Sequence, residues 1–342
     1  MADVTVRGAG IFGLSVAWAC LRRGARVRVI DPYGPGAGAS GGVVGALAPH
    51  VPENWNEKKA FQFESLLMAE QFWAEVADIS GLSPGYARLG RIQPITDAAG
   101  LALARAREHG AAQLWQGKAG WHVEQADNAW CPASPSGYVI RDTLTARLHP
   151  RHACAALVAA LRVTGADVAP DGSDEGRVLW ATGVADLERL NATHHRLVGN
   201  GVKGQGAVLD FDARDQPQLF ADTVHIVPHA DGTTAVGSTS EREYNDPTDT
   251  DAQLDAVIAR ARQAVPALAE ARVIARWAGV RPRSRSRAPM LGAHPLHPGA
   301  FIANGGFKIG FGMAPKVAQV MADLMLDGVD RIPEGFRPEA SL

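Results

Sequence analysis

The chain has 342 residues, and at roughly 150 residues per domain this length predicts two domains. Hydrophobic residues make up 46% of the sequence, which is enough to build two cores and excludes a disordered, collagen-like or coiled-coil chain. The 34 basic and 36 acidic side chains almost cancel, so no chain-wide field favours nucleic acid or an anionic membrane as the general partner.

Two features bear on where the chain resides. Its three cysteines, Cys20, Cys131 and Cys154, are scattered without the spacing of a disulfide framework or a metal site, which is typical of a reducing compartment. The N-terminus enters a strand-like run at once, without the basic and apolar regions of a secretory signal. Arg22 and Arg23 interrupt the longest early apolar run. The sequence therefore predicts a cytoplasmic protein without a membrane span.

The first thirty residues have the pattern of a βαβ unit. An apolar run at Val4–Val6 leads into a glycine turn, a helix follows as far as Leu21, and a second strand covers Arg26–Ile30. The turn, Gly8-Ala9-Gly10-Ile11-Phe12-Gly13, matches G-x-G-x-x-G, whose glycines permit the tight turn, the approach of a pyrophosphate and close helix packing. Asp31 ends the second strand, where it would bind ribose hydroxyls. Together these features favour a dinucleotide site over an accidental glycine turn.

Residues 32–50 form a second glycine-rich segment. It contains Gly36-Ala37-Gly38-Ala39-Ser40-Gly41-Gly42 and continues to Gly45-Ala46-Leu47-Ala48-Pro49, which is too long for an ordinary turn between a strand and a helix. Nicotinamide enzymes seldom follow the acidic position with a second loop that approaches the ligand closely, so this segment favours FAD. The alternative is a flexible surface loop.

The middle of the chain mixes helices with irregular segments. Apolar spacing predicts helices over Asn56–Ile79, closed by Gly81, and over Pro150–Leu161, where proline suits the first turn. Between them, residues 85–136 are irregular except for a helix over Asp97–His109. A strand ends at Ala181-Thr182-Gly183.

The last part is richer in strands. Short strands and turns over 204–237, the helix Asp251–Val265 and the strand Arg272–Val280 predict an antiparallel sheet that carries a helix. A strand at Phe301–Ala303 then leads through a glycine turn into a helix over Met313–Leu326.

Several motifs taken together resemble those of one family. They are Ala181-Thr182-Gly183, the strand 224–228 followed by 236–239, the segment Gly279-Val280-Arg281-Pro282 leading to 289–292, and the turn Gly305-Gly306-Phe307-Lys308. The chain resembles the D-amino acid oxidase family of flavoproteins over nearly its whole length, and within it the glycine and sarcosine oxidases. The turn at 305 resembles the Gly-x-Gly-Phe-Lys turn by which sarcosine oxidases place a glycine backbone and a lysine at the flavin.

The resemblance implies an α/β fold with two domains. A Rossmann-like, three-layer β/β/α FAD-binding domain would comprise residues 1–80, 141–203 and 276–342. An antiparallel-sheet substrate domain would comprise residues 81–140 and 204–275. The run from Val168 to Gly183 is shorter than in relatives, so we expect this edge of the FAD domain to be reduced.

The resemblance also implies FAD in an extended pose, with residues 8–13 at the pyrophosphate and residues 40–47 and 305–309 beside the isoalloxazine ring. We expect the FAD to be bound without a covalent link, because no cysteine lies near Arg281 or in the turn at 305. The implied cofactor-binding residues are Gly8, Gly10, Ile11, Phe12, Gly13, Asp31, Pro32, Ala39, Ser40, Gly41, Gly42, Gly45, Ala46, Leu47, Val168, Ala181, Thr182, Gly183, Gly305, Gly306, Phe307, Lys308 and Ile309.

Three residues are candidates for the substrate site. Arg281 matches the family's arginine that binds the substrate carboxylate, where a guanidinium fixes both position and orientation. Lys308 matches a second cation of the family, and His225 stands where glycine oxidase carries a tyrosine, although a structural histidine is the alternative. The implied reaction is hydride transfer from the α-carbon of a small amino acid or N-alkyl amino acid to the flavin. The imine is then hydrolysed to an oxo acid and an amine, and either oxygen, giving H2O2, or an electron carrier accepts the electrons.

The arginines at 281, 283, 285 and 287 recur at every second position. Because Pro282 and a turn before Pro289 should break the strand, we expect a basic loop with only Arg281 facing inward, rather than a nucleic-acid patch. Ser286 stands where relatives commonly carry aspartate, so this run would favour a more acidic substrate or an acidic macromolecule.

Two other functions stay open. The segment 45–49 and the helix after it also resemble the oxidase half of the enzyme that trims the side chain of wobble uridine in tRNA, although the near-neutral charge makes a nucleic-acid partner a weaker hypothesis. The chain could also be an amino-acid dehydrogenase subunit that passes electrons to a carrier. The histidine pairs His149/His152 and His294/His297 lack a matching third ligand, so no metal site is predicted.

Overall fold

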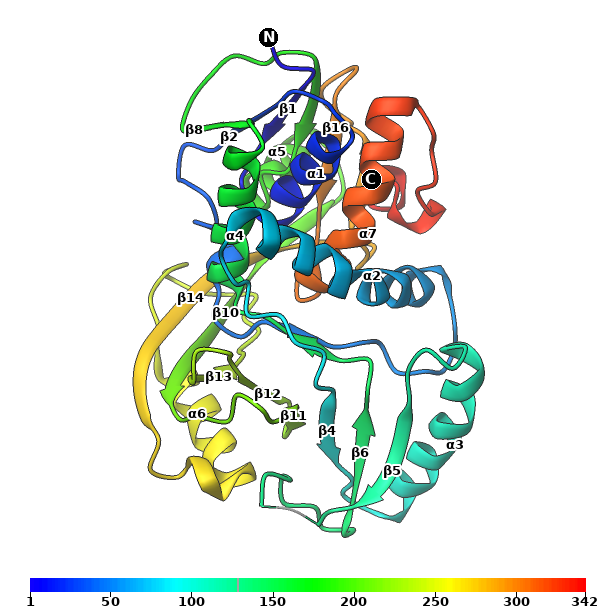
Figure 1. Ribbon diagram of the computed structural model, residues 1–342, viewed down its shortest axis with the longest axis vertical. Helices are drawn as coiled ribbons and strands as arrows, with labels where there is room; N and C mark the ends of the chain where they lie inside the picture. The colour runs from blue at the N-terminus through cyan, green and yellow to red at the C-terminus, as the bar shows by residue number, and fades with distance from the viewer. Residues whose placement is uncertain (128) are drawn as a thin grey trace.

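The computed structural model describes residues 1–127 and 129–342, and it contains two large sheets (Figure 1). The six-stranded sheet has the order β15-β16-β9-β1-β2-β8 and is parallel except for the pair β15–β16. It consists of β1 (Val4–Arg7), β2 (Val27–Ile30), β8 (Asp167–Ala169), β9 (Arg177–Trp180), β15 (Met290–Ala293) and β16 (Phe301–Asn304).

The eight-stranded sheet has the order β14-β10-β13-β12-β11-β4-β6-β5 and is antiparallel except for the pair β4–β11. Its strands are β4 (Arg91–Pro94), β5 (Trp121–Gln125), β6 (Tyr138–Asp142), β10 (Gly199–Asp210), β11 (Gln218–Ala221), β12 (Val224–Pro228), β13 (Thr234–Gly237) and β14 (Arg272–Ser284). A small sheet pairs β3 (Ala46–Leu47) with β7 (Ala146–Arg147). The predicted α/β class, with one Rossmann-like sheet and one largely antiparallel sheet, is confirmed.

The helices divide between the two sheets (Figure 1). Near the six-stranded sheet, α1 (Ile11–Arg22), α2 (Glu57–Ser80), α4 (Pro150–Val163) and α7 (Gly310–Ala322) pack against one another. Their shared core includes the fully buried Leu14, Trp18, Leu66, Trp73 and Leu157. The remaining helices are α3 (Ala98–Leu114), which packs on β5, α5 (Val184–Thr193), and α6 (Ala252–Ala264), which packs on β10 and β13.

Local sequence signals set the helix ends. The side chains of Asn56, Asp97 and Asp251 each accept a hydrogen bond from a backbone N–H of the first turn of α2, α3 and α6. Gly81 closes α2 in a left-handed conformation with φ of 68°. Helix α3 continues to Leu114, five residues beyond the predicted end at His109.

Two expectations about strands were wrong. Strand β14 runs through Pro282 to Ser284, paired with β10, instead of breaking at the proline. Strand β14 lies at the edge of its sheet, next to β10 alone among the described strands. Proline has no backbone N–H, and at an edge there is no second strand that would need this N–H for a hydrogen bond. Residues 85–136 are also not merely irregular, because β4 and β5 lie there and join the sheet through β6 and β11.

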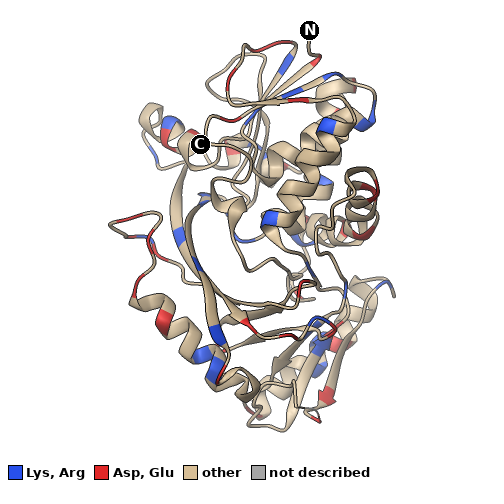
Figure 2. Cartoon of the chain, turned by 60° about the vertical axis from the view of Figure 1, so that its left-hand side comes forward, with Lys and Arg blue, Asp and Glu red and all other residues tan. Residues whose placement is uncertain are grey.

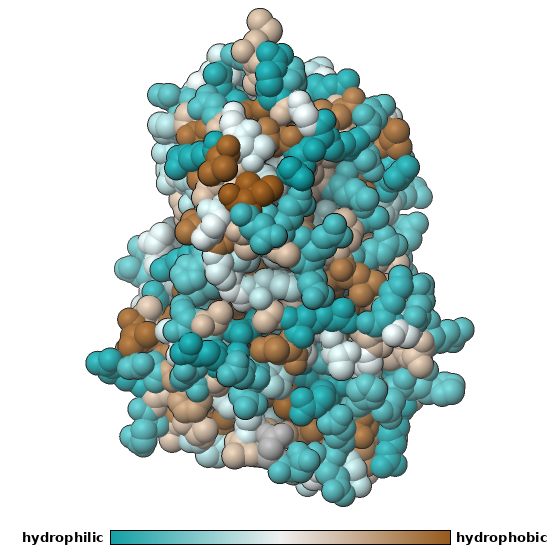
Figure 3. Space-filling view, in the orientation of Figure 1, coloured by the Kyte–Doolittle hydropathy of each residue, from teal (hydrophilic) through white to brown (hydrophobic). Residues whose placement is uncertain are grey.

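The division into domains stays a proposal. The strands of the six-stranded sheet fall within 1–80, 141–203 and 276–342, whereas β6, β10 and β14 cross the proposed limits. Within the described residues, no helix combines the length and apolarity that a membrane crossing needs. Figure 2 shows basic and acidic residues interspersed in both halves of the chain. On the face seen in Figure 3, hydrophobic side chains form small, scattered groups among hydrophilic ones.

Candidate active site

One large cavity, of about 1080 Å3, connects the two halves of the molecule. Its walls come from the glycine turn before α1, the segment 37–48, the end of β9, the strands β12 and β14, and the turn before α7. This volume is slightly above the usual range for ligand pockets, roughly 300–1,000 Å3. The cavity is large enough for an extended ligand that reaches from one sheet to the other.

The glycine turn brings the backbones of β1, α1 and β9 into close contact. Gly8 has φ of 104°, and a Cβ there would lie 2.4 Å from the carbonyl oxygen of Ala181. A Cβ on Gly13 would lie 1.9 Å from the carbonyl oxygen of Gly8, so only glycine lets α1 approach β1 this closely. Gly10, Ile11 and Phe12 line the cavity, so the N-terminus of α1 and its positive dipole lie at the cavity wall, where they would favour an anion.

Two side chains organise this end of the cavity. The Ser40 hydroxyl accepts a hydrogen bond of 2.9 Å from the backbone N–H of Ile11. The Asp31 carboxylate accepts bonds of 2.7 Å from the N–H of Ala9 and 3.0 Å from that of Tyr33. Asp31 is thus held at the tip of β2, where it lines the cavity.

The opposite wall is joined to the turn between β9 and α5 by a residue that the sequence reasoning missed. Asn304, at the end of β16 and 2% exposed, donates 2.8 Å to the carbonyl of Gly183 and accepts 2.7 Å from the N–H of Gly305. Gly305 has φ of 73°, and residues 310–312, the first turn of α7, also line the cavity. An asparagine directly before the double glycine was the available signal.

Arg281 lines the cavity and is buried. It is 8% exposed and sits on β14, where it donates to the Ser238 hydroxyl at 3.1 Å and to the carbonyls of Thr239 at 2.7 Å and Lys203 at 3.5 Å. Its buried Nε has no hydrogen-bond partner among the described residues. Burial lowers the pKa of Arg281 to about 10, opposed by the nearby Glu241 carboxylate, so the guanidinium stays charged at neutral pH.

Lys308 and His225 line the cavity beside Arg281. The Lys308 side chain is exposed, but the space around its ammonium is largely enclosed by protein. Burial and the charges of Arg281 and Arg283 lower its pKa to about 8. Burial, with Arg91 and Lys308 nearby, lowers the pKa of His225 to about 3, so the ring is neutral and carries no charge for catalysis. Its buried Nδ1 has no partner in the described part of the chain.

Of the four arginines, only Arg281 lines the cavity, but Arg283 lies against the same aromatic ring. The guanidinium carbons of Arg281 and Arg283 lie 5.7 and 5.3 Å from the centre of the Phe307 ring, and the Lys308 ammonium lies 5.7 Å from it. Arg283 is half-buried next to this ring but is not among the residues that line the cavity, whereas Arg285 and Arg287 are exposed. Three cations therefore surround one aromatic side chain.

Most of the predicted site residues meet in this cavity, but three do not line it. Gly13 serves the packing of α1, Gly41 lies against the carbonyl of Gly36, and Val168 lies on the edge strand β8, paired with Val29. The predicted residues that do line it are Gly8, Gly10, Ile11, Phe12, Asp31, Pro32, Ala39, Ser40, Gly42, Gly45, Ala46, Leu47, Ala181, Thr182, Gly183, His225, Arg281, Gly305, Gly306, Phe307, Lys308 and Ile309.

The cavity has the features that FAD requires. The N-terminus of α1 and Asp31 line one part of it. The Thr182 hydroxyl is buried and has no hydrogen-bond partner among the described residues, and a polar ligand in the cavity would supply that partner. A family model described as DAO, FAD dependent oxidoreductase, matches residues 3–324. The chain belongs to this family. FAD is its cofactor, and the resemblance predicted from the motifs is confirmed.

Individual relatives of this FAD-dependent oxidoreductase agree with the family. Glycine oxidase from Bacillus licheniformis is 27% identical over 95% of this chain and 93% of its own. Glycine oxidase from Pseudomonas putida is 32% identical, but this match spans only 53% of the chain and 50% of the relative. The crystal structure of iminodiacetate oxidase from Chelativorans sp. BNC1 has a TM-score of 0.86 at 21% identity, covering 98% of each chain, which shows the shared fold.

Proposed function

We propose that the protein oxidises the C–N bond of a small amino acid or N-alkyl amino acid whose carboxylate is bound by Arg281 and Lys308. The observation that carries the proposal is the state of Arg281. This buried guanidinium has no carboxylate oxygen within 4 Å among the described residues and leaves Nε without a partner. Burying an uncompensated charge is unfavourable, and a substrate carboxylate would supply the missing partner.

FAD, which the glycine turn at 8–13 and the segments 40–47 and 305–309 would hold, would supply an acceptor for the hydride of the α-carbon. The protein then has to orient the substrate and does not need a side chain that removes this hydrogen as a proton. The neutral His225 is consistent with a site that needs no catalytic base, because its pKa of about 3 makes it a weak base. We propose that His225 bounds the substrate space and that Arg281 fixes the α-carbon relative to the turn at 305.

The cations around Phe307 favour amines that carry a second acid group. Arg281, Arg283 and Lys308 take part in no ion pair within the described residues, and the charges of Arg281 and Arg283 lower the pKa of Lys308. One carboxylate would leave much of this positive charge unbalanced. A solved structure with the same fold is an iminodiacetate oxidase, a protein named for a dicarboxylic amine. We propose that amines of this charge type bind better here than glycine.

The proposal predicts that Arg283→Gln discriminates between substrates. Arg283 acts through its charge from beside the cavity, so the variant should raise the KM of iminodiacetate about fivefold, the scale of ~1 kcal/mol, while that of glycine or sarcosine changes less than about twofold. Arg285→Gln, on the exposed turn, is the matched control and should change neither KM. An equal effect of Arg283→Gln on all three substrates would remove the argument for a second acid group.

The pKa of Lys308 predicts the pH dependence of carboxylate binding. Lys308 is charged below its pKa of about 8 and loses its charge above it, so binding should be strongest at lower pH and weaken as the pH rises through 8. Propionate is a suitable probe because it has no amine that titrates. Its dissociation constant can be followed by the change in the flavin spectrum, and Lys308→Met should flatten the profile. A profile that is equally steep in Lys308→Met would assign the titration to another group.

One experiment tests the reaction and its electron acceptor. The purified protein is mixed anaerobically with glycine, sarcosine, D-alanine and iminodiacetate, and loss of flavin absorbance identifies substrates. Reduction by none of these amines would overturn the proposal. Oxygen is then admitted to the reduced protein. Rapid reoxidation with H2O2 indicates an oxidase, and slow reoxidation indicates a dehydrogenase that uses a carrier.

A further inference from the structure

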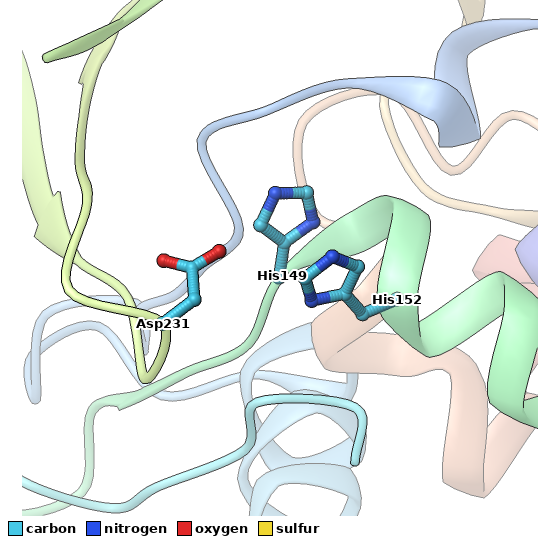
Figure 4. A group of neighbouring side chains, drawn as sticks. All are labelled: His149, His152 and Asp231. Atoms are coloured by element: carbon cyan, nitrogen blue, oxygen red, sulfur yellow. The ribbon is translucent and has the colours of Figure 1, made fainter. Parts of the chain in front are cut away.

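A histidine cluster lies outside the active site, where α4 meets the turn between β12 and β13 (Figure 4). His149 and His152 belong to the start of α4, and Asp231 belongs to the turn. One nitrogen of each imidazole and one carboxylate oxygen all lie within 4.8 Å of one another. The structure thus places a candidate third ligand beside the histidine pair, which showed none in the sequence. The missing group comes from a part of the chain about eighty residues away.

Two of the three side chains have a potential ligand atom that accepts no hydrogen bond from the described residues. His149 Nδ1 is buried and has no hydrogen-bond partner in the described part of the chain. Asp231 is oriented through Oδ1, which accepts 3.0 Å from the N–H and 2.7 Å from the hydroxyl of Thr233. Its Oδ2 accepts no hydrogen bond from the described residues. This arrangement, a carboxylate held by an outer hydrogen bond next to open imidazoles, is the pattern of metal ligands.

The surroundings limit what the cluster can bind. His229, 1% exposed, packs against His149 with ring centres 4.6 Å apart and holds that ring from behind, while His149 and His152 stack at 3.9 Å. The neighbouring cations are directed to other acceptors: Arg147 donates to the carbonyls of Pro228 and Arg214, and Arg151 donates to that of Gly41. Two imidazoles and one carboxylate suit a transition metal such as zinc, whereas calcium and magnesium prefer oxygen ligands.

We propose that His149, His152 and Asp231 form a binding site for a divalent transition-metal ion of the zinc type. His149 and His152 are stacked, so the exposed His152 ring would turn out of the stack, and the exposed Asp231 would approach, to bring the three ligand atoms to a metal–nitrogen distance of about 2.0–2.1 Å. The ion would link α4, which packs on α1 and α2, to the hairpin of the eight-stranded sheet. Pro150, next to His149, lines the cavity, so the link would lie beside the flavin site without forming part of it.

The test uses the flavin-loaded enzyme after removal of metals with a chelator. Titration with ZnCl2 in a calorimeter should show one ion per chain with micromolar affinity, and Zn2+ should raise the melting temperature. Co2+ should give absorption bands in the red, where oxidised flavin does not absorb. Both His152→Ala and Asp231→Asn should weaken Zn2+ binding by about 100-fold. His195→Ala, on an exposed loop after α5, is the control and should bind as the parent does.

The readouts do not depend on turnover, so the proposal can fail independently of the proposed amine oxidation. Zn2+ binding that is the same in His152→Ala, Asp231→Asn and the parent would overturn it, because the ion would then be bound elsewhere. Absence of calorimetric binding at millimolar Zn2+ would also overturn it. Because His152 and Asp231 are exposed, both variants should melt at the parent temperature without metal, which separates loss of binding from loss of folding.

Discussion

Replacing Arg281 with alanine should strongly reduce the turnover of carboxylated amines while the yellow flavin spectrum remains. The variant removes the buried cation that we propose as the substrate anchor. Flavin should stay bound, because the hydrogen-bond partners of Arg281 are Ser238, Thr239 and Lys203 and do not belong to the glycine turn that would bind the nucleotide. Loss of one partner of a buried charged pair costs more than about 2 kcal/mol, which corresponds to a fall in kcat/KM of roughly 30-fold or more. Steady-state kinetics and anaerobic flavin reduction measure it.

Gly204→Ala tests the same anchor without removing its charge. A Cβ on Gly204 would lie 1.4 Å from Nη2 of Arg281, so the guanidinium would have to move although it stays in the protein. We expect a smaller loss of kcat/KM than in Arg281→Ala, with the same flavin content. Arg281→Lys keeps the positive charge but loses the planar guanidinium. Its kcat/KM should therefore also lie between those of the parent and of Arg281→Ala. Unchanged kinetics in Arg281→Ala would refute the anchor role.

Gly13→Ala should yield protein that is largely free of flavin. The added Cβ would lie 1.9 Å from the carbonyl oxygen of Gly8 and 3.2 Å from a methyl group of Val6. Because the closest atom is backbone, α1 must move away from β1, which disturbs the helix N-terminus that would bind the pyrophosphate. Overpacking of this kind typically costs about 1–3 kcal/mol. Flavin absorbance per mole of protein and the melting temperature measure the two effects.

Gly335→Ala is the matched control for this variant. Gly335 has an ordinary negative φ, and an added Cβ there meets no atom within 4 Å. It should keep full flavin content and the parent melting temperature. A fully flavin-loaded Gly13→Ala would mean that the close contact between α1 and β1 is not needed for the nucleotide site.

The parts of the fold that depend on short-range signals could be predicted from the sequence. Asn56, Asp97 and Gly81 mark helix ends because a side chain or a positive φ satisfies the end of the helix within a few residues. The βαβ unit was also predictable, since the strand, the glycine turn and the helix are consecutive in the chain.

Features that depend on distant partners could not be predicted. Strand β14 tolerates Pro282 only because it is an edge strand, and a single strand does not reveal its place in the sheet. Asp231 joins His149 through the meeting of α4 with a hairpin. Asn304 gains its role from a bond to Gly183, over one hundred residues away. Side chains that serve the site through such contacts have no local pattern.

The long pairing of β10 with β14 has a consequence for access to the site. The two strands pair at twelve positions, from Gly199 opposite Ser284 to Asp210 opposite Arg272. They contact α5 in one half of the molecule and α6 in the other. Arg281 is embedded in this ribbon. Swinging the halves apart would have to break or sharply bend many backbone hydrogen bonds at once, at the strand that carries the guanidinium. Entry and exit of small molecules should therefore depend on local rearrangement around a rigid frame rather than on a hinge.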